Sequence, residues 1–567
     1  MKRLWKFIKH QKTDSSGISD LKVDGKLKDD PIAKARALNK QFQSVFTREP
    51  DADQLPDRPH LALDMPPINV TKPGIQKLLC GLNPSKAPGP DGIGPRVLRE
   101  LAENLADPLT TIFNKSIQES QVPSDWRQAN VAPIFKKGQK YDPANYRPIS
   151  LTCIACKLLE HVICHSIMDH VNSAGVLLPQ QHGFRAKLSC ETQLLEFTND
   201  IATNLNRGLQ SDVCVLDFSK AFDKVGHQRL LHKLRWYGIS GKTNNGIASF
   251  LSSRQQTVVV DGKSSEPLPV LSGVPQGSVL GPCLFLLYIN DIAEDLHSKI
   301  RLFADDTMIY LTIKNTPDAH HLQEDLDKLA AWEATWMMQF HPGKCEIISI
   351  SKKSHPIVYN YTLHGQTLRH VDVVKYLGVN ISKDLRWEHH IDYVAAKAMK
   401  PLNFLRRNLK IGNTTVKSNA YKSIVRPILE YGQTVWDPYT ATMTSRLEMV
   451  QRRAARFVTG QHGKTARVTD MLKKLEWETL ETRRRNARLV MFYKIHYSHV
   501  SIKMPLKPKK RKTPSRHENT LVYEIPPSKI DIHKFSFFPR TSREWNTMKE
   551  ETVNIQSLES FKVTVSH

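Results

Sequence analysis

The fold is decided by the stretch Arg301-Leu302-Phe303-Ala304-Asp305-Asp306-Thr307-Met308-Ile309-Tyr310. Two adjacent carboxylates stand there between two short apolar runs rich in strand-forming residues. The pattern predicts a β-hairpin with Asp305 and Asp306 at its turn, although the same dipeptide alone is typical of an ordinary turn. A second apolar run, Asp212-Val213-Cys214-Val215-Leu216-Asp217, also ends on a carboxylate. Two strands of one sheet are therefore expected to bring Asp217 and Asp305 to a single edge.

Carboxylates gathered at one strand edge predict a metal site. Hard oxygen ligands suit Mg²⁺, and two such ions about 4 Å apart can activate an attacking 3′-hydroxyl and stabilise a leaving pyrophosphate. We therefore expect two Mg²⁺ ions and nucleotidyl transfer as the reaction class. Asp217 and Asp305 are the expected direct ligands, and Asp306 is expected to contribute less because adjacent residues on a hairpin point apart.

Between the two acidic strands lies a glycine-rich loop, Ser272-Gly273-Val274-Pro275-Gln276-Gly277-Ser278-Val279-Leu280-Gly281-Pro282. Such a loop lets the backbone approach a ligand closely. Pro282 suits the first turn of the apolar helix that we expect over 284–292. The hairpin follows this loop, and Lys375-Tyr376-Leu377-Gly378-Val379 comes after the hairpin.

These motifs, in this order, resemble the palm of a reverse transcriptase of the non-LTR retrotransposon kind, near the jockey-like and chicken-repeat-like groups. The resemblance runs over nearly the whole chain. It implies an α+β fold, the right-hand polymerase with fingers, palm, helical thumb and a carboxyl-terminal extension. The implied activity is that of an RNA-directed DNA polymerase that copies element RNA into DNA from a 3′-hydroxyl primer. The implied partners are an RNA template, a DNA primer or target, and deoxynucleoside triphosphates.

The resemblance also divides the chain into segments. The chain opens inside the connector that precedes the polymerase in such elements, so we expect the upstream endonuclease domain to be missing and an endonuclease to be supplied in trans. The expected segments are 1–70, a connector with one helix; 71–205, the fingers; 206–350, the palm; 351–390, the primer-grip hairpin region; 391–505, the helical thumb; and 506–567, a basic run and carboxyl-terminal extension.

Arginine and aromatic residues are expected around the nucleotide. Guanidinium forks bind phosphate oxygens bidentately, and by resemblance Arg147 and Arg185 lie in the fingers over the triphosphate or template. Phe222 stands five residues after Asp217. By resemblance its ring excludes a 2′-hydroxyl, whereas the alternative is a phenylalanine of the core. The resemblance adds Gln276, Gly277 and Lys344 as nucleotide-binding residues, with Lys344 near the leaving pyrophosphate; Tyr376, Leu377 and Gly378 as the primer grip; and Lys86 as a template-binding residue.

The charge of the chain points to a polyanionic partner. Lysine and arginine number 81 against 56 acidic residues, a net charge of +25, which is typical of a protein that lies along nucleic acid. We find no signal peptide and no apolar run long enough for a membrane span, so no membrane partner is expected. A nuclear and cytoplasmic, intracellular protein is expected. The basic run Pro508-Lys509-Lys510-Arg511-Lys512 is either a nuclear import signal or a solvated charge run.

Cysteine usage favours reduced thiols, because eight cysteines in 567 residues do not suggest a disulfide scaffold. One segment offers zinc-ligand types at Cys153, Cys156, His161, Cys164 and His165. It has no second Cys-x-x-Cys pair and has the pattern of an amphipathic helix, so no structural zinc is expected.

Several alternatives stay open. Arginine clusters at 406–407, 452–453 and 483–485 either follow the backbone of a duplex or form solvated helix faces. An intron-maturase type of polymerase would carry its own extension, which we do not find. A catalytically silent or domesticated element-derived nucleic-acid-binding protein is opposed by the intact acids at all three positions. A degenerate copy of the element is compatible with the same motifs.

Overall fold

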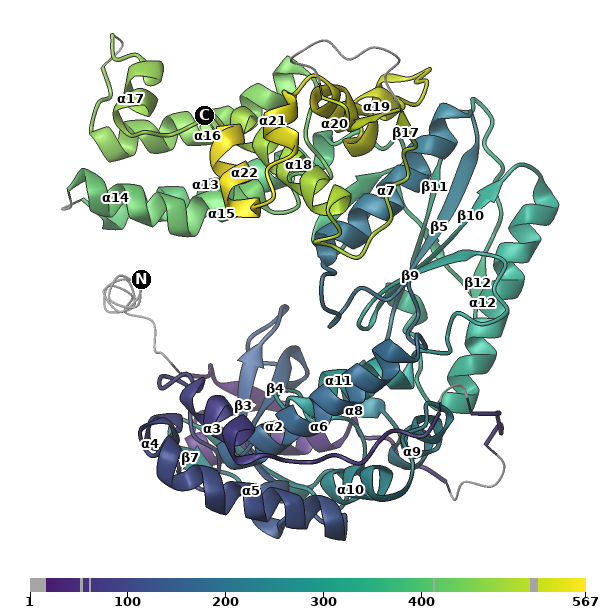
Figure 1. Ribbon diagram of the computed structural model, residues 1–567, viewed down its shortest axis with the longest axis vertical. Helices are drawn as coiled ribbons and strands as arrows, with labels where there is room; N and C mark the ends of the chain where they lie inside the picture. The colour runs from purple at the N-terminus through teal and green to yellow at the C-terminus, as the bar shows by residue number, and fades with distance from the viewer. Residues whose placement is uncertain are drawn as a thin grey trace.

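The computed structural model describes residues 17–50, 55–60, 63–410, 413–463, 465–509 and 519–566. They form an open arc, with a helical region at one end, a mixed lobe at the other and a five-stranded sheet between the two (Figure 1). The α+β class expected from the sequence is confirmed. Within these ranges, no helix is both long and apolar enough to cross a membrane.

The five-stranded sheet has the order β14-β11-β5-β10-β9, so the first acidic strand is central. Its neighbours β10 and β11 both run antiparallel to β5. The hairpin predicted over 301–310 is confirmed, because β9 and β10 are antiparallel neighbours joined by Ala304 and Asp305. The strands are β5 (Gln210–Asp217), β9 (Lys299–Phe303), β10 (Asp306–Ile313), β11 (Glu346–Ile350) and β14 (Arg369–His370).

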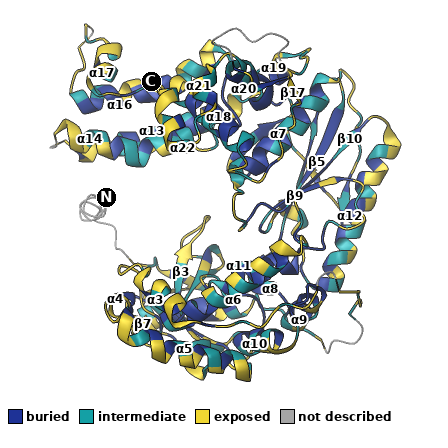
Figure 2. Cartoon of the chain, in the orientation of Figure 1, coloured by how far each residue is buried: buried dark blue, intermediate teal, exposed yellow. Residues whose placement is uncertain are grey.

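Alternation along these strands gives the sheet two apolar faces, and both are covered. Val213, Met308 and Ile348 face α7 (Cys190–Asn206) and belong to a core that continues into the helical region. Their neighbours Leu216, Ile309 and Ile347 belong to a second core on the opposite face. The second core includes α9 (His227–Trp236), α11 (Leu280–Tyr288) and α12 (Thr316–Trp336), and Figure 2 shows the sheet as largely buried.

Helix α11 begins four residues earlier than the expected 284–292, at Leu280, and ends at Tyr288. The reason is a carboxylate distant in sequence: Glu160 accepts hydrogen bonds from the amides of Val279 at 2.6 Å and Leu280 at 3.0 Å. These amides start the helix and would otherwise lack partners. Pro282 lies in the first turn, as expected.

The mixed lobe contains a second sheet of order β4-β3-β6-β7, with β8 also paired to β6. The helix α2 (Pro31–Gln43) packs on it through Leu38 and Phe42, and Asn39 donates to the Ser265 hydroxyl at 2.9 Å. The strands are β3 (Gln128–Phe135), β4 (Tyr146–Leu151), β6 (Gln255–Val260), β7 (Lys263–Ser264) and β8 (Leu268–Pro269). The other helices of the lobe are α3 (Lys72–Cys80), α4 (Pro95–Glu100), α5 (Ala102–Glu119), α6 (Ile154–Ser173), α8 (Ala221–Lys224) and α10 (Gly241–Leu251).

The helical region follows a two-stranded hairpin, β15 (Val373–Tyr376) and β16 (Val379–Ser382). It then closes on itself through carboxyl-terminal helices that pack on α18. Its helices are α13 (Glu388–Asn408), α14 (Thr414–Ala420), α15 (Arg426–Glu430), α16 (Ala441–Thr459), α17 (Val468–Lys474), α18 (Leu480–His496), α19 (Asp531–Lys534), α20 (Phe537–Asn546), α21 (Glu550–Val553) and α22 (Leu558–Ser566).

The predicted basic run is only partly described. Pro508 and Lys509 form the strand β17, which pairs with β18 (Val522–Tyr523). The remaining residues of the run, Lys510, Arg511 and Lys512, lie outside the described residues.

Candidate active site

The three predicted acids meet at one end of the central sheet. Asp217 is the last residue of β5, and Asp306, the first residue of β10, lies directly opposite it in the antiparallel register. Opposed residues of such a pair lie on the same face. The register therefore pairs Asp306 with Asp217, whereas Asp305 lies in the turn beside them. The hairpin gives no reason to rank Asp306 below Asp305, contrary to our expectation from the alternation rule.

The pKa values of the two hairpin acids are raised by burial and by repulsion among the acids. Burial, together with the charges of Asp305 and Asp217, raises the pKa of Asp306 to about 6. Burial also raises the pKa of Asp305, with the charge of Asp217 acting in the same direction. A nearby cation favours the ionised form of a carboxylate, so the site as it stands favours the binding of positive charge.

Three basic residues lie near the acids. The Lys344 Nζ is 3.5 Å from Asp217 Oδ2, and its segment is fixed because the amide of His341 donates to the Asp217 carbonyl at 2.8 Å. Lys136 directly follows β3 and Arg147 lies in β4, both of the second sheet, and their charges lower the pKa values of both hairpin carboxyls. Burial lowers the pKa of Lys136 itself, and the charge of Arg147 lowers it further.

The turn of the hairpin is held by a buried glutamine. The Gln181 Oε1 accepts hydrogen bonds from the amides of Ala304 at 2.9 Å and Gly183 at 2.8 Å, and its Nε2 donates to the Ala304 carbonyl at 3.3 Å. Ala304 has a φ of +55°, a left-handed conformation that is uncommon outside glycine. A Cβ at Gly183 would overlap the Ala304 amide nitrogen. We call Gln181 and Gly183 the turn clasp.

The glycine-rich loop is joined to the segment that follows β5. The Ser272 hydroxyl donates to the Asp223 carbonyl at 2.7 Å, and the Gln276 Nε2 donates to Asp223 Oδ1 at 3.0 Å. Burial raises the pKa of Asp223 to about 6. Gly277 has a φ of +115°, and a Cβ there would lie 2.6 Å from the Ser150 carbonyl oxygen. The predicted pair Gln276 and Gly277 therefore lies between β4 and the segment that follows the acidic strand β5.

Phe222 is half-buried between two other aromatic rings. Its ring stacks on Phe285 of α11 with centroids 4.3 Å apart and contacts Phe184 edge-on at 6.1 Å. Phe184 is 53% exposed. These contacts fix the orientation of the Phe222 ring at the base of α8, close to the glycine-rich loop, whose Val274 amide donates to the Phe222 carbonyl at 2.8 Å.

The other predicted site residues have different surroundings. Arg185 donates to the Leu178 carbonyl at 2.7 Å, and burial lowers its pKa. Lys86 is exposed in the loop before α4. Tyr376 is buried in the core, and Leu377, which is half-buried, and Gly378, which is exposed, form the turn between β15 and β16. That turn is joined to the helical region, because the Tyr431 hydroxyl donates to the Leu377 carbonyl at 2.9 Å.

The donor set fits a divalent cation bound by oxygen. In the parts of the chain that the structure describes, no group of three or more His, Cys, Asp or Glu side chains is placed so that it could hold a metal ion by itself. Mg²⁺ is commonly held by one or two carboxylates together with waters and substrate phosphates, so an open acidic strand end suits it. The cysteine–histidine segment forms α6, in which Cys156 is buried and His165 exposed.

Three contributors were not singled out from the sequence. They are Lys136, Asp223 and Gln181. The signal available for Gln181 was its position one residue before a histidine–glycine pair. Only the fold shows that Gln181 and Gly183 contact the hairpin turn at Ala304.

Comparison with known proteins gives a family match for part of the chain. Residues 134–381 match the family described as reverse transcriptase (RNA-dependent DNA polymerase). The chain is 28% identical over 414 residues to the RNA-directed DNA polymerase from mobile element jockey of Drosophila melanogaster, covering 70% of this chain and 45% of that protein. It is 30% identical over 414 residues to the corresponding protein of Drosophila funebris, covering 70% and 44%. It is 27% identical over 419 residues to the probable RNA-directed DNA polymerase from transposon X-element of Drosophila melanogaster, covering 70% and 45%.

The matched region contains the sheet, the acidic strand end and the glycine-rich loop. Residues 134–381 thus match the reverse transcriptase family, and the chain is similar to the polymerases of jockey-like non-LTR retrotransposons. It spans less than half the length of these relatives.

Proposed function

We propose that this chain is an RNA-directed DNA polymerase that extends a 3′-hydroxyl primer on the RNA of a non-LTR retrotransposon. The observation that carries the proposal is the meeting of Asp217, Asp305 and Asp306 at one strand end, opposite basic residues of the neighbouring sheet. The match to the reverse transcriptase family supports the same reaction. The substrates are an RNA template, a DNA primer or target, and deoxynucleoside triphosphates.

The acids are proposed to hold two Mg²⁺ ions. When bound, these ions would lower the pKa of the attacking hydroxyl and neutralise charge on the transferred phosphoryl group and leaving pyrophosphate. Asp217 and Asp306 lie opposite each other, and Asp305 adds a third carboxylate from the turn. Lys344, beside Asp217, is suited to donate a proton to the leaving pyrophosphate.

The remaining roles are assigned by position. Lys136 and Arg147 would bind the triphosphate, since their charges already act on the hairpin acids. Gln276 and Gly277 would line the nucleotide, Arg185 would follow the triphosphate or template, and Lys86 would contact the template. The turn at Leu377 and Gly378 would support the primer. We assign the fingers to 71–205, the palm to 206–350, the primer-grip region to 351–390 and the thumb to 391–505, with a connector before them and an extension after them.

Primer extension by the purified chain on RNA and DNA templates tests the proposal, with the folded variant Asp217→Asn as the control. We expect extension by the unaltered chain in Mg²⁺ and a loss of several orders of magnitude in the variant, because charge stabilisation is a large share of catalysis. Extension that is equal in both would refute the site. A chain that binds primer–template without extending it would instead be a catalytically silent nucleic-acid-binding protein.

Phe222 is proposed as the residue that selects the sugar. Its fixed ring, stacked on Phe285, would overlap a 2′-hydroxyl without needing a polar partner. We expect Phe222→Val to retain DNA synthesis while ribonucleotide incorporation rises relative to deoxyribonucleotide incorporation. If Phe222 is a core residue only, both rates fall together with a stability loss of roughly 1 to 4 kcal/mol, and the sugar preference stays unchanged.

A further inference from the structure

The helical region contains a large basic cavity that the proposed polymerase reaction does not use. It has a volume of about 1010 Å³, and every residue that lines it lies between Pro438 and Arg540. Its walls are α16, the segment leading into α17, the start of α18 and one residue of α20. In Figure 1 α16 and α17 lie at the end of the helical region away from β5 and β10, and no residue of the central sheet lines the cavity, so the cavity is separate from the acidic strand end.

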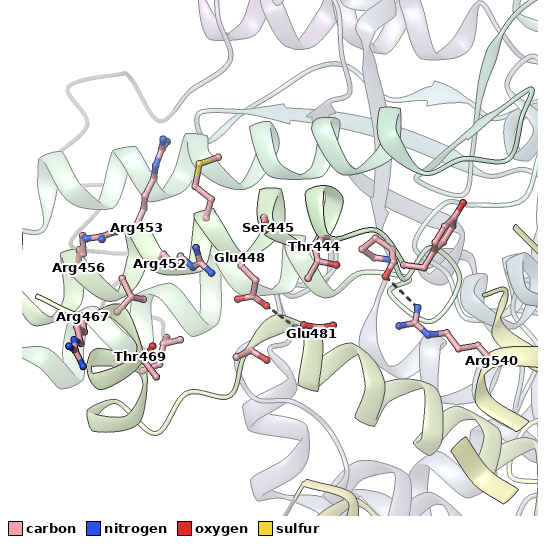
Figure 3. A pocket seen from close by; sticks show the side chains of 17 residues that line it. Thr444, Ser445, Glu448, Arg452, Arg453, Arg456, Arg467, Thr469, Glu481 and Arg540 are labelled. Atoms are coloured by element: carbon pink, nitrogen blue, oxygen red, sulfur yellow. Dashed lines mark hydrogen bonds between the residues drawn. The ribbon is translucent and has the colours of Figure 1, made fainter. Parts of the chain in front are cut away.

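The lining is strongly basic. Five arginines stand against two glutamates, Glu448 and Glu481. Figure 3 shows three of the arginines gathered at one end of the cavity, Arg452 beside Glu448 in the middle, and Arg540 at the other end. Glu448 is already engaged, because it accepts a hydrogen bond from the amide of Glu481 at 2.9 Å. The arginines are Arg452, Arg453, Arg456, Arg467 and Arg540.

A second arginine cluster, on the neighbouring helix α18, is paired with carboxylates, whereas most of the described arginines of the cavity are not. Arg483 pairs with Glu430 and Glu478, Arg484 with Asp437 at 2.7 Å, and Arg485 with Glu544 at 3.3 Å. That cluster holds helices together. Among the described residues, by contrast, the four arginines at 452, 453, 456 and 467 form no ion pair. Burial raises the pKa of Glu448 and the charge of the neighbouring Arg452 lowers it, so the charges of the other three arginines are the more available to a ligand.

The chemistry of the cavity selects a phosphate backbone over a small molecule. Small-molecule pockets are mostly apolar with few charged groups, whereas this one spreads guanidinium groups along its length. Guanidinium forks match phosphate oxygens bidentately. The one aromatic residue of the described lining, Tyr439, is stacked on Phe535 with centroids 4.7 Å apart, so its ring face is not available to bases. Contacts to phosphate position a strand without reading its sequence.

We propose that this cavity is a second nucleic-acid-binding site, which holds the phosphodiester backbone of RNA or DNA outside the polymerase centre and independently of base sequence. The four arginines without ion pairs supply the contacts, and Glu481 sets one edge. The inference goes beyond the proposed polymerase activity. Its test measures binding in the absence of nucleotides, so a chain without polymerase activity would still give an answer.

The test compares Arg452→Gln/Arg456→Gln/Arg467→Gln with a control that removes the same charge elsewhere, Lys473→Gln/Lys474→Gln/Lys549→Gln. The three control lysines are exposed and outside the lining. Binding of fluorescent single-stranded RNA, single-stranded DNA and duplex DNA is measured from 50 to 300 mM salt. Three lost phosphate contacts should lower the slope of log K against log salt by about 2 to 3 and weaken binding roughly 100-fold near 0.1 M salt.

Each outcome has a meaning. We expect the loss in the cavity variant only, and the oligonucleotide with the greatest loss identifies whether RNA, single-stranded DNA or duplex DNA uses the site. Arg452→Lys/Arg456→Lys/Arg467→Lys, which keeps the charge, should keep most of the slope. Unchanged binding of all three oligonucleotides, or an equal loss in the control, overturns the proposal. If the triple variant unfolds, Arg453→Gln/Arg467→Gln at two exposed positions carries the same test, with a slope change of about 1.4 to 1.8.

Discussion

Two charged clusters of this molecule are built in opposite ways. At the end of the central sheet, Asp217, Asp305 and Asp306 lie together, and within the described part of the chain their one ion pair is the exposed contact of Lys344 with Asp217 at 3.5 Å. In the helical region a single buried carboxylate, Asp437, is surrounded by three arginines. Its ion-pair distances are 2.7 Å to Arg484, 2.8 Å to Arg488 and 3.1 Å to Arg540, and Glu544 extends the network.

The two clusters thus differ in what their charge does: the charge of Asp437 stabilises the fold, whereas the charge of the three acids is available to a ligand. A buried carboxylate with guanidinium partners is neutralised within the protein, so removing it leaves buried charge without a partner. Carboxylates that repel one another are neutralised only from outside, by a cation or by protonation. The three-acid cluster should therefore matter to activity and not to stability, whereas Asp437 should matter to stability first.

The largest expected effect is that of Asp305→Asn on activity. We expect primer extension to fall by roughly 10³-fold or more, since one carboxylate of the metal site is lost. The free energy of unfolding in EDTA should stay the same or rise, because the substitution removes a like charge. A variant that is both inactive and strongly destabilised would show that the acid cluster stabilises the fold. The two charged clusters would then not differ in the way described.

Asp437→Asn is expected to lower the free energy of unfolding by about 3 to 5 kcal/mol, because three arginines lose a buried partner. Denaturant unfolding followed by circular dichroism measures it. The matched control is Asp392→Asn, which removes the exposed pair with Arg446 at 2.9 Å and should cost about 1 kcal/mol or less. Equal losses in the two variants would mean that burial of the pair is unimportant.

The three acids have few counter-charges that could hold them together. Their placement therefore depends on the hydrogen bonds of the turn clasp. We expect Gln181→Ala to reduce the rate of primer extension about 10- to 100-fold, since small misplacement of reacting groups is costly. The control is Gln193→Ala, another buried glutamine, which donates to the Leu302 carbonyl of β9 at 3.0 Å and not to the turn. Both variants should lose similar stability, and only Gln181→Ala should lose the rate. Equal rates of primer extension in the two variants would show that the turn clasp does not contribute to catalysis.

The smallest effect is a pH dependence of stability in the absence of metal. The pKa of Asp306 rises from 3.8 to about 6 on folding, so the folded state holds its proton more tightly than the unfolded state. The free energy of unfolding should therefore fall as the pH rises from 4 to 6 and stay lower above pH 6. Asp223 follows the same trend, so the difference between Asp306→Asn and the unaltered chain reports Asp306. The difference should shrink in Mg²⁺; a difference that does not depend on pH would contradict the prediction.

The sequence was sufficient to predict those features that depend on neighbouring residues. The hairpin over 301–310 and the acidic end of β5 follow from short apolar patterns, and the structure has them at the expected places. The start of α11 was wrong by four residues because it depends on Glu160, which lies more than a hundred residues away. The clasp by Gln181 and the use of Arg483–Arg485 as ion-pair partners were missed for the same reason. Both depend on which distant segments the fold brings together.

The close contact of Gly183 in the turn clasp limits which mutations such a chain can accept. Any side chain at this position would carry a Cβ into the Ala304 amide, and every amino-acid change at a glycine codon introduces one. Tolerance at position 183 should thus be close to zero in a saturation screen for polymerase activity, while the exposed positions of α16 accept many residues. Among copies of the element that no longer undergo selection, substitutions at Gly183 should accumulate as freely as at any other codon. A substitution at Gly183 would therefore indicate loss of function even in a copy whose three acids are intact.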